Sequence, residues 1–248
     1  MAAYDFAAPR LFVDAPLRAG TVVALDRVQA NYLVNVLRLR AGDAVLIFNG
    51  RDGEWRARLR AEGRRETSLM PEVQARPQTP PPDLAYLFAP LKSARLDYMV
   101  QKAVEMGVGR LGPVLTRRTQ AARVNLERMR ANAVEAAEQC GILTLPEISG
   151  PVSLAAALDA LEPGRLLVFC DEDAPVHDPV AALRAADPAA GLALVIGPEG
   201  GFDEAERALI LRRPALVRLS LGPRILRADT AAVAALALVQ AVLGDARG

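Results

Sequence analysis

The stretch LALVIGPEGGFDEAE, residues 192–206, carries the pattern that decides the fold. A short apolar run, Leu192–Ile196, leads into a loop that contains the glycines Gly197, Gly200 and Gly201. Glycine lets the backbone turn sharply and approach a ligand closely. Asp203 and Glu206 then have the spacing of a helix N-cap and its capping-box partner. The sequence predicts a strand, a glycine loop and a helix N-terminus, where open α/β sheets bind ligands. A tight turn before a well-capped helix is the alternative.

A second glycine loop follows another apolar run, in LSLGPRILRADTAAVAALALVQ, residues 219–240. Gly222 makes a turn, Arg224 and Arg227 flank two apolar residues, and Asp229 or Thr230 is expected to cap a helix that is apolar almost all round. Such a helix must be buried on every side, in a core or at a subunit interface. Neither loop has the GxGxxG or GxxxxGK[ST] pattern, and this absence argues against a binding site for a dinucleotide or a nucleoside triphosphate.

Apolar runs and helical segments alternate through the last two thirds of the chain. The runs are Leu84–Pro90, Leu111–Leu115, Arg165–Cys170, Leu192–Ile196 and Ala215–Leu221. Helical spacing marks Ala94–Met106, with Gly107 at the C′ position, and Asn125–Gln139, with Asn125 as N-cap. Short runs without polar alternation are typical of buried parallel strands, so we expect an α/β sheet covered on both faces.

The proline-rich segment RPQTPPPD, residues 76–83, separates this region from a β-rich one. Before it we expect a helix near Asp26–Arg38 and strands at Arg10–Val13, Thr21–Leu25, Ala44–Phe48 and Glu54–Arg60. In the last strand Arg56, Arg58 and Arg60 alternate with apolar residues. This basic face is either simply solvated or follows the phosphates of a nucleic acid.

Composition excludes some classes of protein. Hydrophobic residues make up 52% of the 248 residues and charged residues 24%, which is ordinary for a globular protein. The longest apolar stretch, Ala231–Leu243, is too short to span a membrane, and the start MAAYDFAAPR is unlike a secretory signal, so we expect a cytoplasmic protein. Cys140, Cys170 and His177 have no metal-ligand spacing, so no metal site is predicted. A Cys–His nucleophile pair stays open, although packing is the simpler role for both thiols.

Charge is distributed unevenly, although the formal net charge is only +1. Residues 92–130 contain nine Lys and Arg against three Asp and Glu, whereas residues 131–248 contain nine against sixteen. The middle of the chain is either a surface that faces a polyanion or a set of solvated helix faces. Neither glycine loop has a Ser-His-Asp set or a carboxylate pair, which favours a protein that binds a reactive cofactor beside a second substrate.

Eight segments in order resemble the ribosomal RNA small subunit methyltransferase E family, of the SPOUT superfamily. They are PRLFVD (9–14), NYLVNVLRLRAGD (31–43), FNGRDGEW (48–55), APLKSARLDYMVQKAVEMGV (89–108), LTRRTQ (115–120), AAEQCG (136–141), IGPEGG (196–201) and LGPRILRADTA (221–231). The resemblance implies a PUA-like RNA-binding β-barrel over residues 1–75, a linker over 76–82 and a SPOUT α/β domain with a trefoil knot over 83–248. It also implies a homodimer.

The same resemblance implies methylation of uridine N3 in 16S rRNA, as free RNA or within the small ribosomal subunit, with S-adenosyl-L-methionine as cofactor. The cofactor would contact the loop after Arg165–Cys170 and the residues Gly197, Glu199, Gly200, Gly201, Leu219, Leu221, Gly222, Ile225, Leu226 and Thr230. Arg227 and Asp229 are the candidate catalytic residues, and water or the Asp229 carboxylate would accept the N3 proton. The candidate RNA contacts are Arg10, Arg38, Arg56, Arg58, Lys92, Lys102 and Arg118.

Three positions depart from the family pattern: Asp229 stands where glutamate is usual, Ile142 replaces a common arginine, and Asn31 replaces a common histidine. Two other functions remain open. One is a non-enzymatic RNA-binding or ribosome-assembly protein whose C-terminal domain only dimerises. The other is a related knotted methyltransferase that acts on tRNA or on another rRNA position.

Overall fold

The computed structural model describes residues 8–62, 66–121, 123–188 and 190–245. Within these ranges the chain divides into two compact units, whose bounds are Met1–Pro81 with Ala137–Leu145, and Pro82–Ala136 with Pro146–Gly248. The break between Pro81 and Pro82 lies in the proline-rich segment, whereas the place of Ala137–Leu145 in the first unit was not expected from the sequence. Residues 1–7, which bear on the expected lack of a secretory signal, lie outside the described residues. No helix among the described residues has the length and apolar character needed to cross a membrane.

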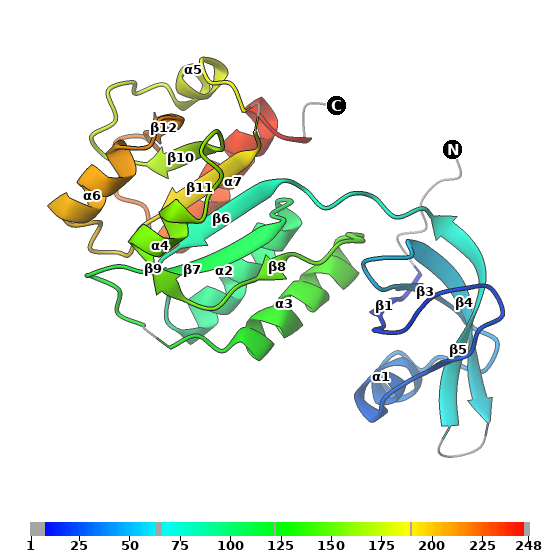
Figure 1. Ribbon diagram of the computed structural model, residues 1–248. Coiled ribbons are helices and arrows are strands. Elements are labelled where there is room, and N and C mark those ends of the chain that lie inside the picture. The colour runs from blue at the N-terminus through cyan, green and yellow to red at the C-terminus, as the bar shows by residue number, and fades with distance from the viewer. Residues whose placement is uncertain (1–7, 63–65, 122, 189, 246–248) are drawn as a thin grey trace. The chain divides into compact units, whose positions relative to one another are not determined.

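The described strands of the first unit form an open, curled five-stranded sheet (Figure 1). Its order is β1 (Arg10–Phe12), β3 (Ala44–Phe48), β4 (Glu54–Glu62), β5 (Glu66–Arg76) and β2 (Val23–Ala24). The β1–β3 pair is parallel and the others are antiparallel. Because no pairing among the described residues joins β1 to β2, the sheet is open at that edge, in contrast to the closed barrel that we expected.

Strand β5 is the element of this sheet that the sequence did not predict. Its sequence is polar and contains Pro71, which lacks the N–H that a ladder needs. Pro71 pairs with Ala57 beside a register shift between Arg56 and Ala57, and strands tolerate proline at such irregularities. The alternation predicted for β4 is confirmed, since Ala57 and Leu59 are buried and Arg56 and Arg60 are exposed.

The predicted helix of the first unit is present but divided. An α-helix, α1 (Arg27–Asn31), begins with a capping box between Asp26 and Gln29, and a π-helix, η1 (Tyr32–Val36), follows directly. Leu33 of η1 is fully buried among the apolar side chains of the sheet. The helix therefore completes the core of this unit.

The second unit contains a parallel sheet with the order β12-β10-β11-β6-β7-β8 among the described residues. The strands are β6 (Leu84–Phe88), β7 (Arg110–Leu115), β8 (Glu147–Ile148), β10 (Leu166–Cys170), β11 (Leu192–Ile196) and β12 (Leu216–Leu219), and the short β9 (Val152–Ser153) pairs with β7. Every residue of β6 and β11 is buried. The predicted parallel sheet is confirmed, with strand ends that differ from the expected ones by at most two residues.

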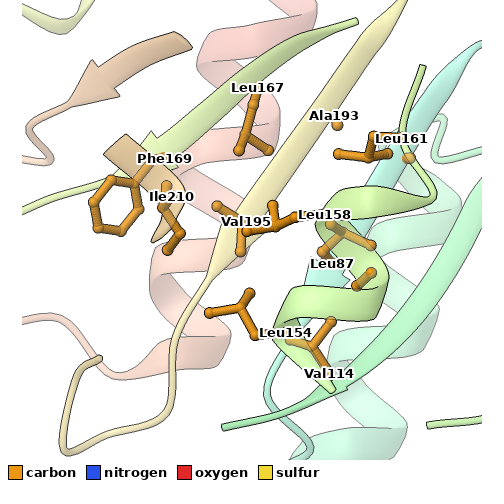
Figure 2. Close-up of a cluster of buried hydrophobic side chains, with 12 residues drawn as sticks. Leu87, Val114, Leu154, Leu158, Leu161, Leu167, Phe169, Ala193, Val195 and Ile210 are labelled. Carbon is orange, nitrogen blue, oxygen red and sulfur yellow. The ribbon is translucent and has the colours of Figure 1, made fainter. Parts of the chain in front are cut away.

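Helices cover both faces of this sheet. On one face, α4 (Leu154–Asp159) and α6 (Glu204–Leu211) pack on side chains such as Leu87 and Val195. Figure 2 shows α4 over these strands, with Ile210 of α6 beside them. On the other face lies α2 (Ser93–Glu105), where the Tyr86 hydroxyl reaches the Met99 sulfur at 3.3 Å. The remaining helices are α3 (Leu126–Gln139), whose last residues belong to the first unit, α5 (Pro179–Arg184) and α7 (Ala228–Val242).

Helix α7 differs from its prediction in two respects. Its N-cap is Arg227, so Asp229 and Thr230 lie within the first turn and neither is the cap. The helix packs against α2, α5 and β11, and much of its apolar surface is therefore covered within the chain. Its buried residues are Ala228, Ala231, Ala232, Ala235, Leu236, Val239 and Gln240, whereas Ala237 and Ala241 are exposed.

Candidate functional site

The loops singled out in the sequence meet at one edge of the parallel sheet. Strands β6, β10, β11 and β12 are parallel neighbours, so the segments that follow them leave from the same edge. From β6 the chain runs to β7 on one side, and later returns to place β10 and β11 on the other side. Such a reversal of strand order, between β6 and β11, is where α/β sheets commonly bind ligands.

One arginine joins two of these segments. Arg95, in the first turn of α2, donates from Nε and Nη2 to the two carboxylate oxygens of Asp229, at 3.0 and 2.8 Å. Its remaining nitrogen, Nη1, donates to the Glu199 carboxylate in the glycine loop after β11. The structure thus brings together Glu199 and Asp229, which were both predicted, through a residue that was not predicted.

The contact with Arg95 favours the ionised form of the Asp229 carboxyl group. The hydrogen bonds from Arg95 lower the pKa of Asp229, with a further contribution from the Thr230 N–H, which donates to Oδ1 at 3.0 Å. In turn, Asp229 and Glu199 raise the pKa of Arg95, so this guanidinium stays charged. An ionised carboxylate whose two oxygens both accept from Arg95 is poorly suited to remove a substrate proton. Asp229 is therefore better suited to hold the guanidinium of Arg95 in place than to act as a general base.

The glycine loop after β11 has its predicted form. The capping box of α6 is present, with mutual bonds between Asp203 and Glu206 at 2.8 and 3.0 Å. Gly201 has a φ of 71°, a conformation that side chains disfavour. The Arg118 guanidinium donates to the carbonyl of Gly200 at 2.6 Å, so the loop after β7 also supports the glycine loop. A Cβ at Gly197 would lie 2.7 Å from the Phe202 ring, which leaves no room for a side chain.

The loop after β12 presents the remaining predicted cofactor residues. Leu219 is buried at the end of the strand, and Leu221 and Leu226 are half-buried. Gly222 has a φ of 92° and open space around it, and Ile225 is 90% exposed. Thr230 is also exposed. This loop therefore offers backbone groups and apolar side chains to a ligand.

The loop after β10 contains a buried carboxylate that sequence reasoning did not select. Asp171 accepts hydrogen bonds from Arg207 of α6 and from Arg218 of β12, at 3.0 and 2.6 Å. It follows Cys170, whose pKa rises to about 12 because burial and the nearby carboxylate disfavour the thiolate. Cys170 is therefore unsuited to be a nucleophile. Asp171 connects the loop after β10 with α6 and β12 through its two arginine partners. Cys140 is exposed, which differs from the expected packing role.

The candidate RNA contacts of the first unit fall into two groups. Arg10 is buried, with 6% of its side chain exposed, and it pairs with the fully buried Glu54 at 2.7 Å. It also donates to the carbonyls of Ala137, Glu138 and Ile142. Its guanidinium therefore holds the first unit together and is not available to RNA, in contrast to the expectation.

The other candidates of this unit lie at the surface. Arg38 and Arg56 are exposed, and Arg38 has a positive φ of 58°. Arg58 is half-buried because it pairs with Glu72 at 3.1 Å and donates to the Gly42 carbonyl. Arg56 and Arg58 share the basic face of β4 that the sequence predicted.

The candidate RNA contacts of the second unit are not equivalent either. Lys92, just before α2, and Arg118 are exposed and lie in loops at the sheet edge that carries the cofactor loops. Lys102 lies seven residues after Arg95, about 10 Å further along α2. It pairs with Glu105 at 2.7 Å and lies 5.6 Å from the Tyr98 ring centroid. Lys102 is thus apart from the loops that form the site.

Comparison with known protein families defines the class of protein. Residues 78–240 match the RNA methyltransferase domain family, and residues 25–67 match the RNA methyltransferase PUA domain. The second match lies in the open sheet of the first unit, and the first includes both glycine loops. The two matches define a two-domain RNA methyltransferase.

Individual relatives identify the family. The ribosomal RNA small subunit methyltransferase E of Synechocystis sp. is 31% identical over 95% of this chain and 76% of its own length. That of Rickettsia conorii is 28% identical over 93% of this chain and 94% of its own. The chain belongs to the ribosomal RNA small subunit methyltransferase E family.

Solved structures agree with this assignment. The family member from Neisseria gonorrhoeae, bound to S-adenosyl methionine, superposes with a TM-score of 0.80 at 27% identity, over 94% of this chain and 97% of that one. A methyltransferase from Legionella pneumophila in complex with the cofactor SAM gives a TM-score of 0.79, also at 27% identity and with the same coverage.

Proposed function

We propose that this protein transfers the methyl group of S-adenosylmethionine to N3 of a uridine in small-subunit ribosomal RNA. The observation that carries the proposal is the contact of Arg95 with both Glu199 and Asp229. It joins the loops after β11 and β12 at the sheet edge where ligands of α/β proteins bind. A member of the family and a second methyltransferase of the same fold have been solved with this cofactor, and each superposes over 94% of this chain.

The residues at this edge fit such a cofactor. The backbone around Gly201 and Gly222 is open, with no atom within 4 Å of an added Cβ, so a ligand can approach it closely. Gly197–Gly201 and Leu219–Leu226 would hold the nucleoside through backbone groups and apolar contacts. When bound, the cofactor supplies an electrophilic methyl group on a sulfonium, and the protein has to place the uridine in line with it.

The uridine must lose its N3 proton before or during methyl transfer. The reaction therefore needs a proton acceptor and a group that stabilises the negative charge on the base. Arg227 is exposed at the N-terminus of α7, and no hydrogen bond or ion pair of its guanidinium is found among the described residues. It is the group that would stabilise the negative charge that develops on the base. Asp229 is held by Arg95, which leaves water, or the second carboxylate oxygen of Glu199, as the proton acceptor.

RNA would bind to both units. Arg38 and the basic face of β4 provide cations in the first unit, and Lys92 and Arg118 provide them beside the cofactor loops in the second. These contacts recognise phosphates and therefore position the RNA without reading its sequence. Since N3 lies inside a Watson–Crick pair, the target uridine must be unpaired or turned out of the helix.

The proposal includes a homodimer and a knotted C-terminal chain, both of which come from the family resemblance. Supporting the dimer, α7 retains a strip of small exposed residues, Ala237 and Ala241, that a second copy could cover closely. Two-fold dimers are the commonest closed assembly. The knot rests on the family resemblance, and the packing of α7 on α2, α5 and β11 is compatible with it.

The rival function is an RNA-binding scaffold without catalysis, and calorimetry separates the two. The purified protein should bind S-adenosylmethionine at micromolar concentration with a stoichiometry of one cofactor per chain. Titration with adenosine serves as the control for unspecific nucleoside binding and should give a much weaker signal. A protein that binds RNA but gives no heat with S-adenosylmethionine would support the scaffold.

A further inference from the structure

Arg95 occupies an unusual position among the ion pairs of the second unit. All three of its side-chain nitrogens donate to carboxylates, and the two acceptors follow different strands of the sheet. Asp229 is 16% exposed and Arg95 29% exposed, so water screens their contact only in part. One cation thus connects the glycine loop with the first turn of α7.

The two carboxylates have few other attachments. Arg95 is the partner found for the Glu199 side chain in the described part of the chain. Within the described ranges, the other groups found to donate to the Asp229 carboxylate are the backbone N–H groups of Thr230 and of Asp229 itself. The N-cap residue Arg227 gives α7 no side-chain cap. The distance between the glycine loop and the first turn of α7 therefore depends strongly on Arg95.

Arg95 itself stands on a rigid base. Its neighbours on α2, Leu96 and Met99, are buried against the sheet, and α2 also packs along α7. A guanidinium is planar and donates in fixed directions, so it transmits this rigidity to both carboxylates, which the flexible ammonium of lysine does not.

Resting on the function proposed above, we propose that Arg95 is a positioning residue for cofactor binding: it fixes the Gly197–Gly201 loop and the first turn of α7 relative to each other before the cofactor arrives. Loops that are ordered in advance bind more tightly, because less conformational entropy is lost on binding. Arg95 acts through Glu199 and Asp229 and does not need to touch the cofactor.

A second ion pair of the same unit supplies a matched control. Arg128 of α3 donates from Nε to both oxygens of Asp97 on α2, at 2.9 and 3.0 Å, and this pair involves neither cofactor loop. If the Arg95 contacts serve only the stability of the fold, Arg95→Met and Arg128→Met should behave alike.

The experiment measures S-adenosylmethionine affinity by calorimetry and the thermal unfolding temperature of the full chain for Arg95→Met, Arg95→Lys, Arg128→Met, Glu199→Gln and Asp229→Asn. We expect Arg95→Met and Arg95→Lys to weaken cofactor binding by roughly tenfold or more, while Arg128→Met binds like the wild type. The Glu199→Gln and Asp229→Asn variants should each weaken binding, and adding Arg95→Met to the two together should cause little further loss.

Other results would overturn the proposal. Wild-type affinity in Arg95→Met, or full rescue by Arg95→Lys, would mean that the bridging geometry is not needed. If Arg95→Met does not fold, the Glu199→Gln and Asp229→Asn variants decide, because wild-type affinity in both excludes action through these carboxylates. A wild-type protein that does not bind the cofactor would instead refute the proposed function, so the two failures are distinguishable.

Discussion

Arg95 and Asp229 are 134 positions apart in the chain, yet the guanidinium of one donates a hydrogen bond to each carboxylate oxygen of the other. This geometry is the strong, bidentate form of an arginine–carboxylate pair. It brings the start of α2, which follows β6, to the start of α7, which follows β12. Because Glu199 joins the same guanidinium, three segments of the site edge share one ionic centre.

The ion pair predicts how stability depends on pH. Because Arg95 lowers the folded-state pKa of Asp229, the pair stabilises the fold fully above the unfolded-state pKa of the carboxyl. This stabilisation is lost as the pH falls through the lowered folded-state pKa. At pH 7, Asp229→Asn should reduce the free energy of unfolding by about 1–2 kcal/mol in urea titrations.

The same difference should shrink toward zero in strongly acidic solution, where the wild-type carboxyl is also neutral. Asp97→Asn is the control, because Arg128 likewise lowers the pKa of Asp97, although that arginine is exposed. Its effect should be smaller and more sensitive to salt. A loss in Asp229→Asn that stays constant down to low pH would show that the charge of Asp229 does not matter.

The glycine loop should not tolerate a side chain at Gly200. A Cβ there would lie 3.3 Å from Cδ of Arg118, so Gly200→Val must displace the arginine that bonds to the loop. We expect cofactor affinity to fall by about tenfold or more, with an almost unchanged unfolding temperature. Gly150→Val is the matched control, since a Cβ at Gly150 meets no atom within 4 Å. If Gly200→Val binds the cofactor with unchanged affinity, this loop is only a turn and has no role in cofactor binding.

Gly197 should behave differently from Gly200. An added Cβ would meet the ring of Phe202 at 2.7 Å, and Phe202 packs against the core under α6. Gly197→Ala should therefore lower the free energy of unfolding, by about 1–3 kcal/mol, as overpacked cores usually do. Chemical denaturation measures this directly. An unfolding free energy equal to the wild-type value would show that the ring moves away without cost.

The basic face of β4 predicts a salt-dependent contribution to RNA binding. Arg56→Ala should lower the slope of log affinity against log salt by about 0.7–0.9 units, because one phosphate contact is lost. Arg58→Ala should change it less, because Glu72 already neutralises that arginine. Cofactor affinity should stay the same in both. Arg51, which pairs with Asp14 in the same unit, is the control. A salt slope unaffected by Arg56→Ala would leave this face merely solvated.

The proposed homodimer is tested at the exposed strip of α7. Light scattering should give twice the chain mass of 26.5 kDa at micromolar concentration. Ala237→Glu places a charge on the strip and should produce monomers, because an unpaired carboxylate is costly to bury. Val152→Glu, at an exposed position of β9, is the control and should leave the mass unchanged. A wild-type mass near 26.5 kDa would contradict the dimer.

Local sequence patterns predicted the parallel sheet because its strands are continuous apolar runs that are buried on both faces. They did not predict β8 and β9, which have two residues each, or the short helices α4 and α5, since such elements depend on tertiary contacts. The capping box of α6 was visible because its partners are three residues apart. The predicted N-cap of α7 was wrong, because the N-cap position is occupied by Arg227, whose side chain makes no cap hydrogen bond.

Arg95 shows why part of the site was missed. Its partners lie 104 and 134 positions away, so no spacing rule connects them. The available signal was its place in the first turn of the helix that follows the buried strand β6, within a segment that carries the family resemblance. Arg10 shows the opposite error, because a cation in a basic, β-rich region was assigned to RNA although Glu54 and three carbonyls occupy it. Sequence gives residue types and periodicity, whereas the partner of a charge depends on the fold.

Methyl transfer to uridine N3 of small-subunit ribosomal RNA can be measured directly. Small subunits from a strain without the gene should be incubated with the purified protein and isotope-labelled S-adenosylmethionine, and the RNA then digested to nucleosides for mass spectrometry. We expect labelled 3-methyluridine in the small-subunit RNA, and much less of it with Arg95→Met at limiting cofactor. Label in another nucleoside, in transfer RNA alone, or in no RNA although the cofactor binds, would contradict this expectation.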